Sequence, residues 1–71
     1  MRMIPVWRLQ DQLGDQVQCV VRRIGFAWLL LVQRGGEDCV AEHHRLSSQA
    51  LARATEIHGV FTELGYSEQV H

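Results

Sequence analysis

The longest uninterrupted hydrophobic run of the chain extends from Phe26 to Val32 and lies between two glycine-containing turn signals. Glycine accepts a positive φ at no steric cost, so Ile24-Gly25 and Gly35-Gly36 predict tight hairpin connections on either side of the run. A short apolar run bounded by turns is typical of a strand at the centre of a sheet. We therefore expect residues 26–34 to form the central strand of the fold.

Three further strands are expected around this central strand. Residues 16–23 alternate between apolar and polar side chains, as a half-buried strand does. Residues 37–44 follow the Gly35-Gly36 turn directly, and residues 6–10 precede a turn that contains Gly14. Together these segments predict a meander of four antiparallel strands.

The turns also predict which residues face each other. A two-residue loop at Gly35-Gly36 pairs Arg34 with Glu37, which is a favourable pair of opposite charges. In the same register Val32 lies opposite Cys39. With a loop at Ile24-Gly25 and an odd-numbered first loop, one face of the meander becomes apolar. Its expected members are Trp7, Leu9, Val17, Cys19, Val21, Trp28, Leu30, Val32, Cys39 and Ala41.

The C-terminal third of the chain predicts a helix that covers this face. Apolar residues recur there at spacings of four and three, as one helical stripe requires. The stripe consists of Ala50, Ala54, Ile57, Phe61 and Leu64. Ser47 or Ser48 is expected to cap the start of the helix. Gly65 is expected to end it in a Schellman motif, with Tyr66 in contact with Phe61.

The expected fold class is therefore α+β, with the order β-β-β-β-α and one C-terminal helix packed on one face of a four-stranded antiparallel meander. The 71 residues are expected to form a single small domain. Residues 1–5 and 67–71 are expected to be loose termini.

The same register leaves the second face of the sheet apolar at its centre. Five aliphatic residues collect there: Val6, Val20, Leu29, Leu31 and Val40. They lie inside a polar rim of Gln16, Gln18, Gln33, Asp38, Glu42 and His44. A sheet covered on one side normally alternates apolar and polar residues, so an apolar centre with a polar rim predicts contact with another protein chain.

A second copy of the chain is the simplest partner, because twofold homodimers are the commonest oligomers. Another protein remains possible as the partner. Two alternatives need no partner: the first four residues could fold across the patch, or scattered aliphatic residues could be tolerated there. A stripe of small residues on the outer side of the helix is a second possible surface. It consists of Ala52, Thr55, Gly59 and Thr62.

Composition narrows the location and the class of partner. Seven arginines and eight acidic residues give a net charge of -1, which provides no general attraction for nucleic acid or anionic lipid. The longest apolar run is far shorter than the roughly 20 residues that cross a bilayer. Two cysteines and an N-terminus without signal-peptide features favour a reducing, cytoplasmic location.

No catalytic, cofactor or metal motif emerges from the residues. Cys19 and Cys39 are expected on one buried face with a strand between them, a separation too large for a disulfide. Glu42, His43 and His44 are the only clustered metal ligands, but neighbours on a strand point to opposite faces, which disfavours a joint site. We therefore predict a non-enzymatic interaction module without cofactors or metals.

Nucleic-acid binding is the alternative from another class, since a sheet backed by one helix can enter a DNA groove. Such a surface needs arginines and polar side chains for phosphates and base edges. Here the exposed sheet face offers Arg8 and Arg22, but it also offers Asp38 and Glu42, which disfavour this alternative.

Overall fold

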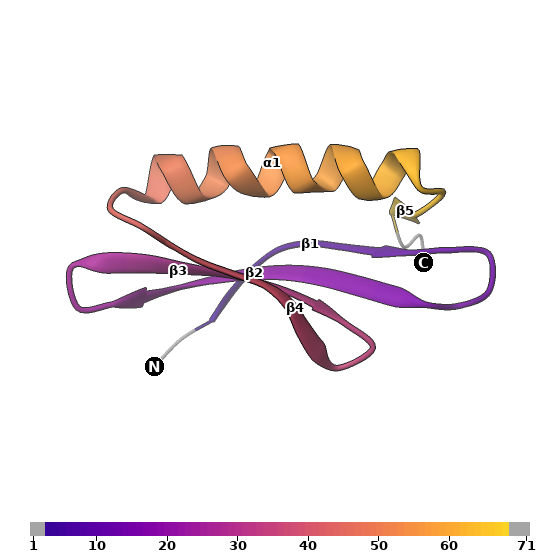
Figure 1. Ribbon diagram of the computed structural model, residues 1–71, viewed down its shortest axis with the longest axis horizontal. Helices are drawn as coiled ribbons and strands as arrows, with labels where there is room; N and C mark the ends of the chain where they lie inside the picture. The colour runs from indigo at the N-terminus through magenta and orange to yellow at the C-terminus, as the bar shows by residue number, and fades with distance from the viewer. Residues whose placement is uncertain (1–2, 69–71) are drawn as a thin grey trace.

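The computed structural model describes residues 3–68 and confirms the α+β class, with a single helix lying across one face of an antiparallel sheet (Figure 1). The elements in chain order are β1 (Ile4–Gln10), β2 (Gln16–Ile24), β3 (Ala27–Arg34), β4 (Glu37–His44), α1 (Ser47–Glu63) and β5 (Ser67–Glu68). In the sheet they are arranged as β4-β3-β2-β1-β5. The predicted four-stranded meander is thus present, with one short strand added at its edge.

The additional strand corrects the prediction of loose termini. β5 pairs with the end of β1, where Leu9 lies opposite Glu68 and Gln10 opposite Ser67. At the other end of the chain β1 already begins at Ile4, which pairs with Val21. Residues 1–2 and 69–71, which belong to the same prediction, lie outside the described residues.

The β2–β3 hairpin turns one residue later than predicted, which shifts the pairing of the two strands by two residues. Ile24 pairs with Ala27, so the two-residue loop consists of Gly25 and Phe26, with Gly25 at φ +59°. Phe26 therefore belongs to the turn and is 97% exposed, although the sequence places it in the central strand. Because side chains alternate with a period of two, this shift of pairing leaves the faces of β2 and β3 as predicted.

A bulge in β4 reverses the faces of the residues that follow it. Arg34 pairs with Glu37 as predicted, but Val32 then pairs with Val40 instead of Cys39. Cys39 is the extra residue, and it is exposed. Val40 consequently packs against the core under α1. Ala41, opposite Leu31, faces away from the helix. The expectations that Cys39 and Ala41 lie under α1 and that Val40 lies on the other face are therefore wrong.

The core lies between the sheet and α1. Its buried members are Leu9, Val17, Cys19, Val21, Leu30, Val32, Ala50, Ala54, Ile57 and Tyr66. At its margin, the indole Nε1 of Trp7 donates a hydrogen bond of 2.9 Å to the carbonyl oxygen of Ala54. Small alanines at the helix surface let the sheet approach closely, so this bond joins β1 to the middle of α1.

The two ends of α1 differ in how well the sequence predicts them. Leu46, not a serine, occupies the N-cap position, and its backbone N–H donates to Oε1 of Gln49 at 3.2 Å. At the C-terminal end the predicted Schellman motif is present, since the N–H of Tyr66 donates to the carbonyl of Phe61 at 3.0 Å and Gly65 has φ +101°. The rings of Phe61 and Tyr66 meet edge to face at 5.3 Å, as expected. Leu64, by contrast, is 66% exposed and not part of the buried stripe.

Tyr66 also connects the end of the helix to the first hairpin. Its hydroxyl donates to Oδ2 of Asp15, which also accepts a bond of 2.7 Å from Nε of Arg34. The hydrogen bond from Tyr66 and then the guanidinium of Arg34 lower the pKa of Asp15 below its ordinary value of 3.8. The ionised carboxylate therefore links the β1–β2 loop, β3 and the segment after α1.

We expect Asp15→Asn to lower the melting temperature at neutral pH and to have a vanishing effect in acid. A carboxyl group with a lowered folded-state pKa stabilises the fold above its unfolded value of 3.8 and loses this contribution as the pH falls through the folded pKa. Thermal melts of both proteins between pH 2 and 7 measure the difference. Glu63→Gln, which removes an exposed carboxylate from the last turn of α1, is the control. A difference for Asp15→Asn that persists unchanged at the acid end would contradict this assignment.

Candidate functional site

The side of the sheet opposite α1, which we name the open face, carries no helix or strand of residues 3–68 (Figure 1). Its side chains form three parallel rows that cross the strands. The central, apolar row consists of Pro5, Val20, Leu31 and Ala41, each opposite the next in the strand ladders. The face is therefore the surface of the fold on which a partner would meet the sheet directly.

Three of the five predicted interface residues lie together on the open face. Val20 is directly opposite Leu31, and Leu29 lies two residues along β3 from Leu31. Val20 and Leu31 are only 7% and 9% exposed, whereas Leu29 is half-buried. The apolar surface left for a partner is smaller than the sequence predicts.

The other two predicted residues are drawn to the core. Val40 changes face because of the bulge at Cys39, as described above. A second irregularity lies in β1 between Pro5 and Trp7, where the register with β2 shifts. Val6 is the residue between them, and it packs against the core cluster. Both exceptions have one origin, since each follows from an extra residue in an outer strand of the meander.

A second row, on one side of the apolar row, contains Arg22, Leu29 and His43. Leu29 lies opposite Arg22 on β2 and opposite His43 on β4. Nε of Arg22 is buried and has no hydrogen-bond partner. Within residues 3–68 it is the one buried side-chain nitrogen or oxygen in this situation. An unsatisfied buried guanidinium nitrogen costs free energy, so this position lowers the stability of the isolated chain.

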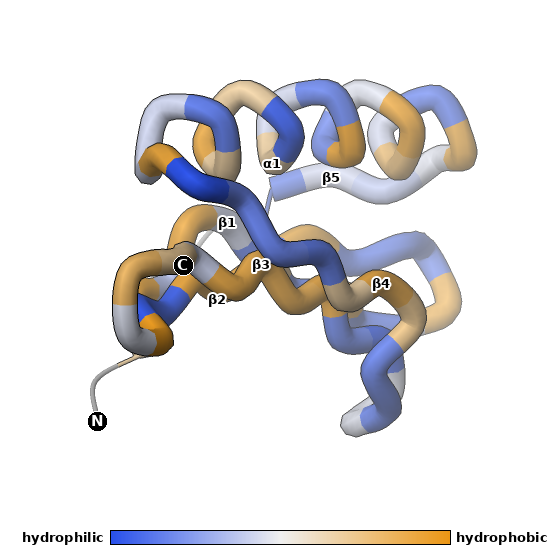
Figure 2. Tube along the Cα trace, turned by 60° about the vertical axis from the view of Figure 1, so that its left-hand side comes forward, coloured by the Kyte–Doolittle hydropathy of each residue, from blue (hydrophilic) through white to orange (hydrophobic). Residues whose placement is uncertain are grey.

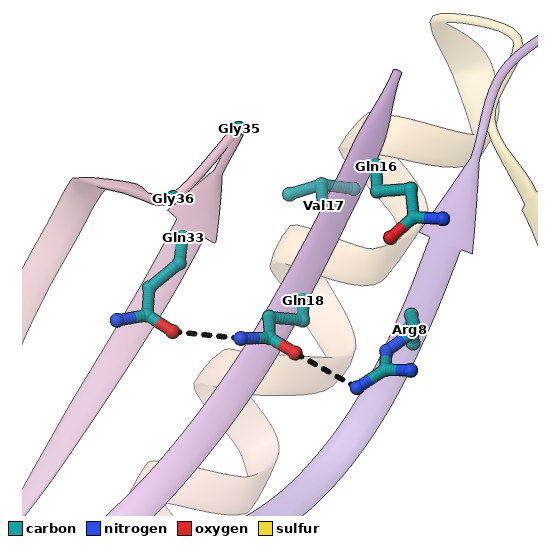
Figure 3. A pocket seen from close by; sticks show the side chains of 7 residues that line it. All are labelled: Arg8, Gln16, Val17, Gln18, Gln33, Gly35 and Gly36. Atoms are coloured by element: carbon teal, nitrogen blue, oxygen red, sulfur yellow. Dashed lines mark hydrogen bonds between the residues drawn. The ribbon is translucent and has the colours of Figure 1, made fainter. Parts of the chain in front are cut away.

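A polar row on the other side of the apolar row crosses the four strands of the meander. The guanidinium of Arg8 donates to Gln18 at 3.2 Å, Nε2 of Gln18 donates to Gln33 at 2.8 Å, and Nε2 of Gln33 donates to Oδ1 of Asp38 at 3.0 Å. Figure 3 shows Arg8, Gln18 and Gln33 in line on adjacent strands. The row thus has a cation at one edge and a carboxylate at the other.

A hollow of about 320 Å³ lies beside the polar row at the end of the sheet where β3 turns into β4 (Figure 3). Arg8, Gln16, Gln18 and Gln33 line it together with the backbone of Gly35 and Gly36. These groups can donate hydrogen bonds to carbonyl, carboxylate or phosphate oxygens. The sequence pattern predicts these glutamines as members of the polar rim, but it does not indicate that Gln18 and Gln33 are hydrogen-bonded to each other.

Two predicted rim residues, Glu42 and His44, lie on the helix side of the sheet. Oε1 of Glu42 is 3.1 Å from Nε2 of His44, and both its oxygens lie 3.1 Å from Nε of Arg53 on α1. The bulge that moves Val40 also moves these residues. As a result, Glu42 pairs with Arg53 on the helix side of the sheet, and Asp38 is the acidic residue of the polar row on the open face.

The histidines, cysteines and acidic residues of the described part of the chain are spread over several elements of the fold. No group of three or more histidine, cysteine or acidic residues within residues 3–68 is placed to hold a metal ion. Burial raises the pKa of the Cys19 thiol to about 11, so this sulfur is protonated and inert at neutral pH. The ring of His58, predicted at the helix margin, lies nearly perpendicular to the ring of Trp7, and its Nε2 is 3.1 Å from Oε1 of Glu68 on β5.

Comparison of the chain with models of known protein families, with curated proteins and with solved structures finds no match. Within residues 3–68, α1 lacks the length and the apolar character that a bilayer crossing requires.

Proposed function

We propose that this chain is a small non-enzymatic interaction module that forms a homodimer through its open face. The observation that carries the proposal is the apolar row, which crosses the meander without a covering layer of described residues and is bordered by polar side chains on both sides. Val20, Leu29 and Leu31 form the centre of the contact. An apolar centre within a polar border is the usual anatomy of a protein interface.

Charge supports a second copy as the partner. The polar row runs from Arg8 on β1 to Asp38 on β4. A twofold axis parallel to the strands stacks the apolar rows of two copies and sets β1 of each over β4 of the other. Arg8 then faces Asp38 of the partner subunit, and the reverse pair forms at the opposite edge. Such a self-complementary arrangement is what a closed dimer requires.

The location that fits this proposal is the cytoplasm. Cys19 and Cys39 are free thiols, and Cys39 is exposed. Exposed free thiols persist in reducing compartments and are rare where disulfides form. Another protein could occupy the open face in place of the second copy, in which case the chain alone is monomeric.

We expect the wild-type chain to form dimers through this face and Leu29→Arg to abolish them while the fold is retained. Light scattering coupled to size-exclusion chromatography measures the mass, and circular dichroism verifies folding. Leu13→Arg is the matched control, because Leu13 is 94% exposed in the β1–β2 loop, away from the open face. A folded Leu29→Arg protein with the wild-type mass would overturn the choice of surface.

A charge exchange tests the arrangement of the two copies. Arg8→Asp and Asp38→Arg should each weaken the dimer by placing like charges opposite each other, and the double variant should restore it. Dilution series of the four proteins give the dissociation constants. Equal weakening in the double variant would exclude the proposed axis.

Nucleic-acid binding is the second candidate, and one observation favours it. The hollow beside the polar row is lined by Arg8 and three glutamines and carries no acidic side chain among its lining residues. Arginine and glutamine are suited to base edges and phosphates. Fluorescence anisotropy with a labelled DNA duplex at low salt tests it, with Arg8→Ala expected to weaken binding and Arg45→Ala as the control outside the hollow. No binding at 20 mM salt would exclude this candidate.

A further inference from the structure

The end of the molecule where β2 turns into β3 and α1 begins, which we name the hairpin end, exposes several large apolar side chains. Figure 2 shows hydrophobic segments at this turn and just before the helix, at the same end of the structure. Its partly or fully exposed members are Met3, Ile4, Phe26, Leu46 and Leu51. Apolar exposure is thus more concentrated here than on the open face.

Within the hairpin end, an apolar hollow of about 140 Å³ opens between the sheet and the first turns of α1. Ile4 and Val21 line it from the first two strands, Trp28 from β3, and Ser47 and Leu51 from the helix. An enclosed apolar cavity of about 150 Å³ is large enough to bind benzene. The hollow therefore has the size and the chemistry to receive one aromatic ring.

Phe26 presents such a ring at the same end. It is 97% exposed in the two-residue loop between β2 and β3, so it does not occupy the hollow of its own chain. The loop is held by a bond of 3.2 Å from Nε of Arg23 to the carbonyl of Gly25. A short, hydrogen-bonded loop orders the backbone that carries the ring, which reduces the entropy lost when the ring is buried.

We propose that Phe26 of one copy inserts into the hairpin-end hollow of a second copy, and that the second copy does the same in return. The two features lie close together, because Phe26 is two residues from Trp28, which lines the hollow. A twofold axis between two hairpin ends therefore allows both insertions at once, so a single chain supplies both the ring and its receptor. The occupant is a second copy because this chain already carries the complementary ring.

This contact goes beyond the proposed function, since it uses a different surface from the open face. The hollow opens between the sheet and α1, whereas the open face lies on the opposite side of the sheet. A chain that uses both twofold contacts forms assemblies of at least four copies. A chain that uses one of them forms dimers.

Phe26→Ser removes the inserting ring without changing the core, so it should reduce the mass of the assembly. If both contacts exist, light scattering should give at least four chains for the wild type, two for Phe26→Ser, two for Leu29→Arg and one for the double variant. If the wild type is a dimer that only Phe26→Ser makes monomeric, the hairpin-end contact is supported and the open-face proposal fails. If only Leu29→Arg has this effect, or if the wild type is monomeric at 100 µM, the hairpin-end contact is overturned.

Two further variants separate loss of the contact from general effects. Leu13→Ser removes an equally exposed apolar side chain at another loop and should leave the mass unchanged. Ser47→Leu fills the hollow while Phe26 is retained, and it should reduce the mass to the same extent as Phe26→Ser. A Ser47→Leu protein with the wild-type mass would show that Phe26 does not insert there.

Quenching of tryptophan fluorescence by acrylamide gives a second readout. Insertion of Phe26 covers Trp28, so in a Trp7→Phe background the remaining Trp28 should become less accessible as the protein concentration rises. Phe26→Ser should abolish this concentration dependence, and an unchanged dependence would overturn the proposal.

Discussion

Leu30→Ala is expected to lower the free energy of unfolding by about 2–5 kcal/mol, the usual cost of a large-to-small change in a fully packed core. Leu30 is fully buried between β3 and α1, so its removal leaves a cavity under the helix. A domain of this length has a total stability of roughly 4–10 kcal/mol. The variant should therefore lose a large part of the protein's stability and unfold at a clearly lower urea concentration than the wild type.

Leu29→Ala is the matched control, because it makes the same chemical change on the opposite face of the same strand. Leu29 is half-buried on the open face, so its replacement should cost well under half as much. Urea unfolding followed by circular dichroism measures both variants, at a protein concentration low enough to keep any dimer dissociated. Equal losses for the two variants would show that the core does not lie on one side of β3.

Val40→Asp is expected to destabilise the protein by at least about 2 kcal/mol, since it places a carboxylate against the core beside Glu42. Cys39→Asp should change stability by less than about 1 kcal/mol, because Cys39 is exposed at the bulge. The pair distinguishes the observed register from the regular ladder, in which the effects would be exchanged. Urea unfolding again provides the measurement, and a larger loss for Cys39→Asp would rule out the bulge.

The alternation of apolar residues predicts most of the fold, because the face of a side chain depends only on whether its position along the strand is odd or even. The hairpin at Gly25 turns later than the sequence indicates, but the change moves the pairing of Val21 from Trp28 to Leu30 and keeps every side chain of β2 and β3 on its face. Trp7 and Leu9 pair with Cys19 and Val17 as expected, which confirms the odd-numbered first loop.

Alternation does not predict faces correctly beyond a β-bulge, because one extra residue exchanges the two faces of all residues that follow it in the strand. Nothing local in residues 37–44 marks Cys39 as the extra residue. The bulged arrangement lets Val40 reach the core and Glu42 reach Arg53 on the helix. Both gains depend on tertiary contacts, so a pattern confined to the strand does not contain them.

The sequence predicts only part of the open face, because the bulges lie in the outer strands of the meander. Val20, Leu29 and Leu31 lie on central strands, whose faces were predicted correctly. The hydrogen-bonded row from Arg8 to Asp38 needs the register of all four strands at once. The hairpin-end hollow depends on how α1 leaves β4 after Leu46, which spacing along the chain does not determine.

The contacts of Trp7 and Tyr66 have a consequence for synthesis on the ribosome. Trp7 bonds to a residue 47 positions later, and Tyr66 bonds to Asp15, which is 51 positions earlier. The hairpins can form from neighbouring residues as the chain emerges, whereas the apolar side of the sheet waits for the helix. A nascent chain that ends before Ser47 therefore exposes Leu9, Leu30 and Val32 to water and is prone to aggregate until α1 is made.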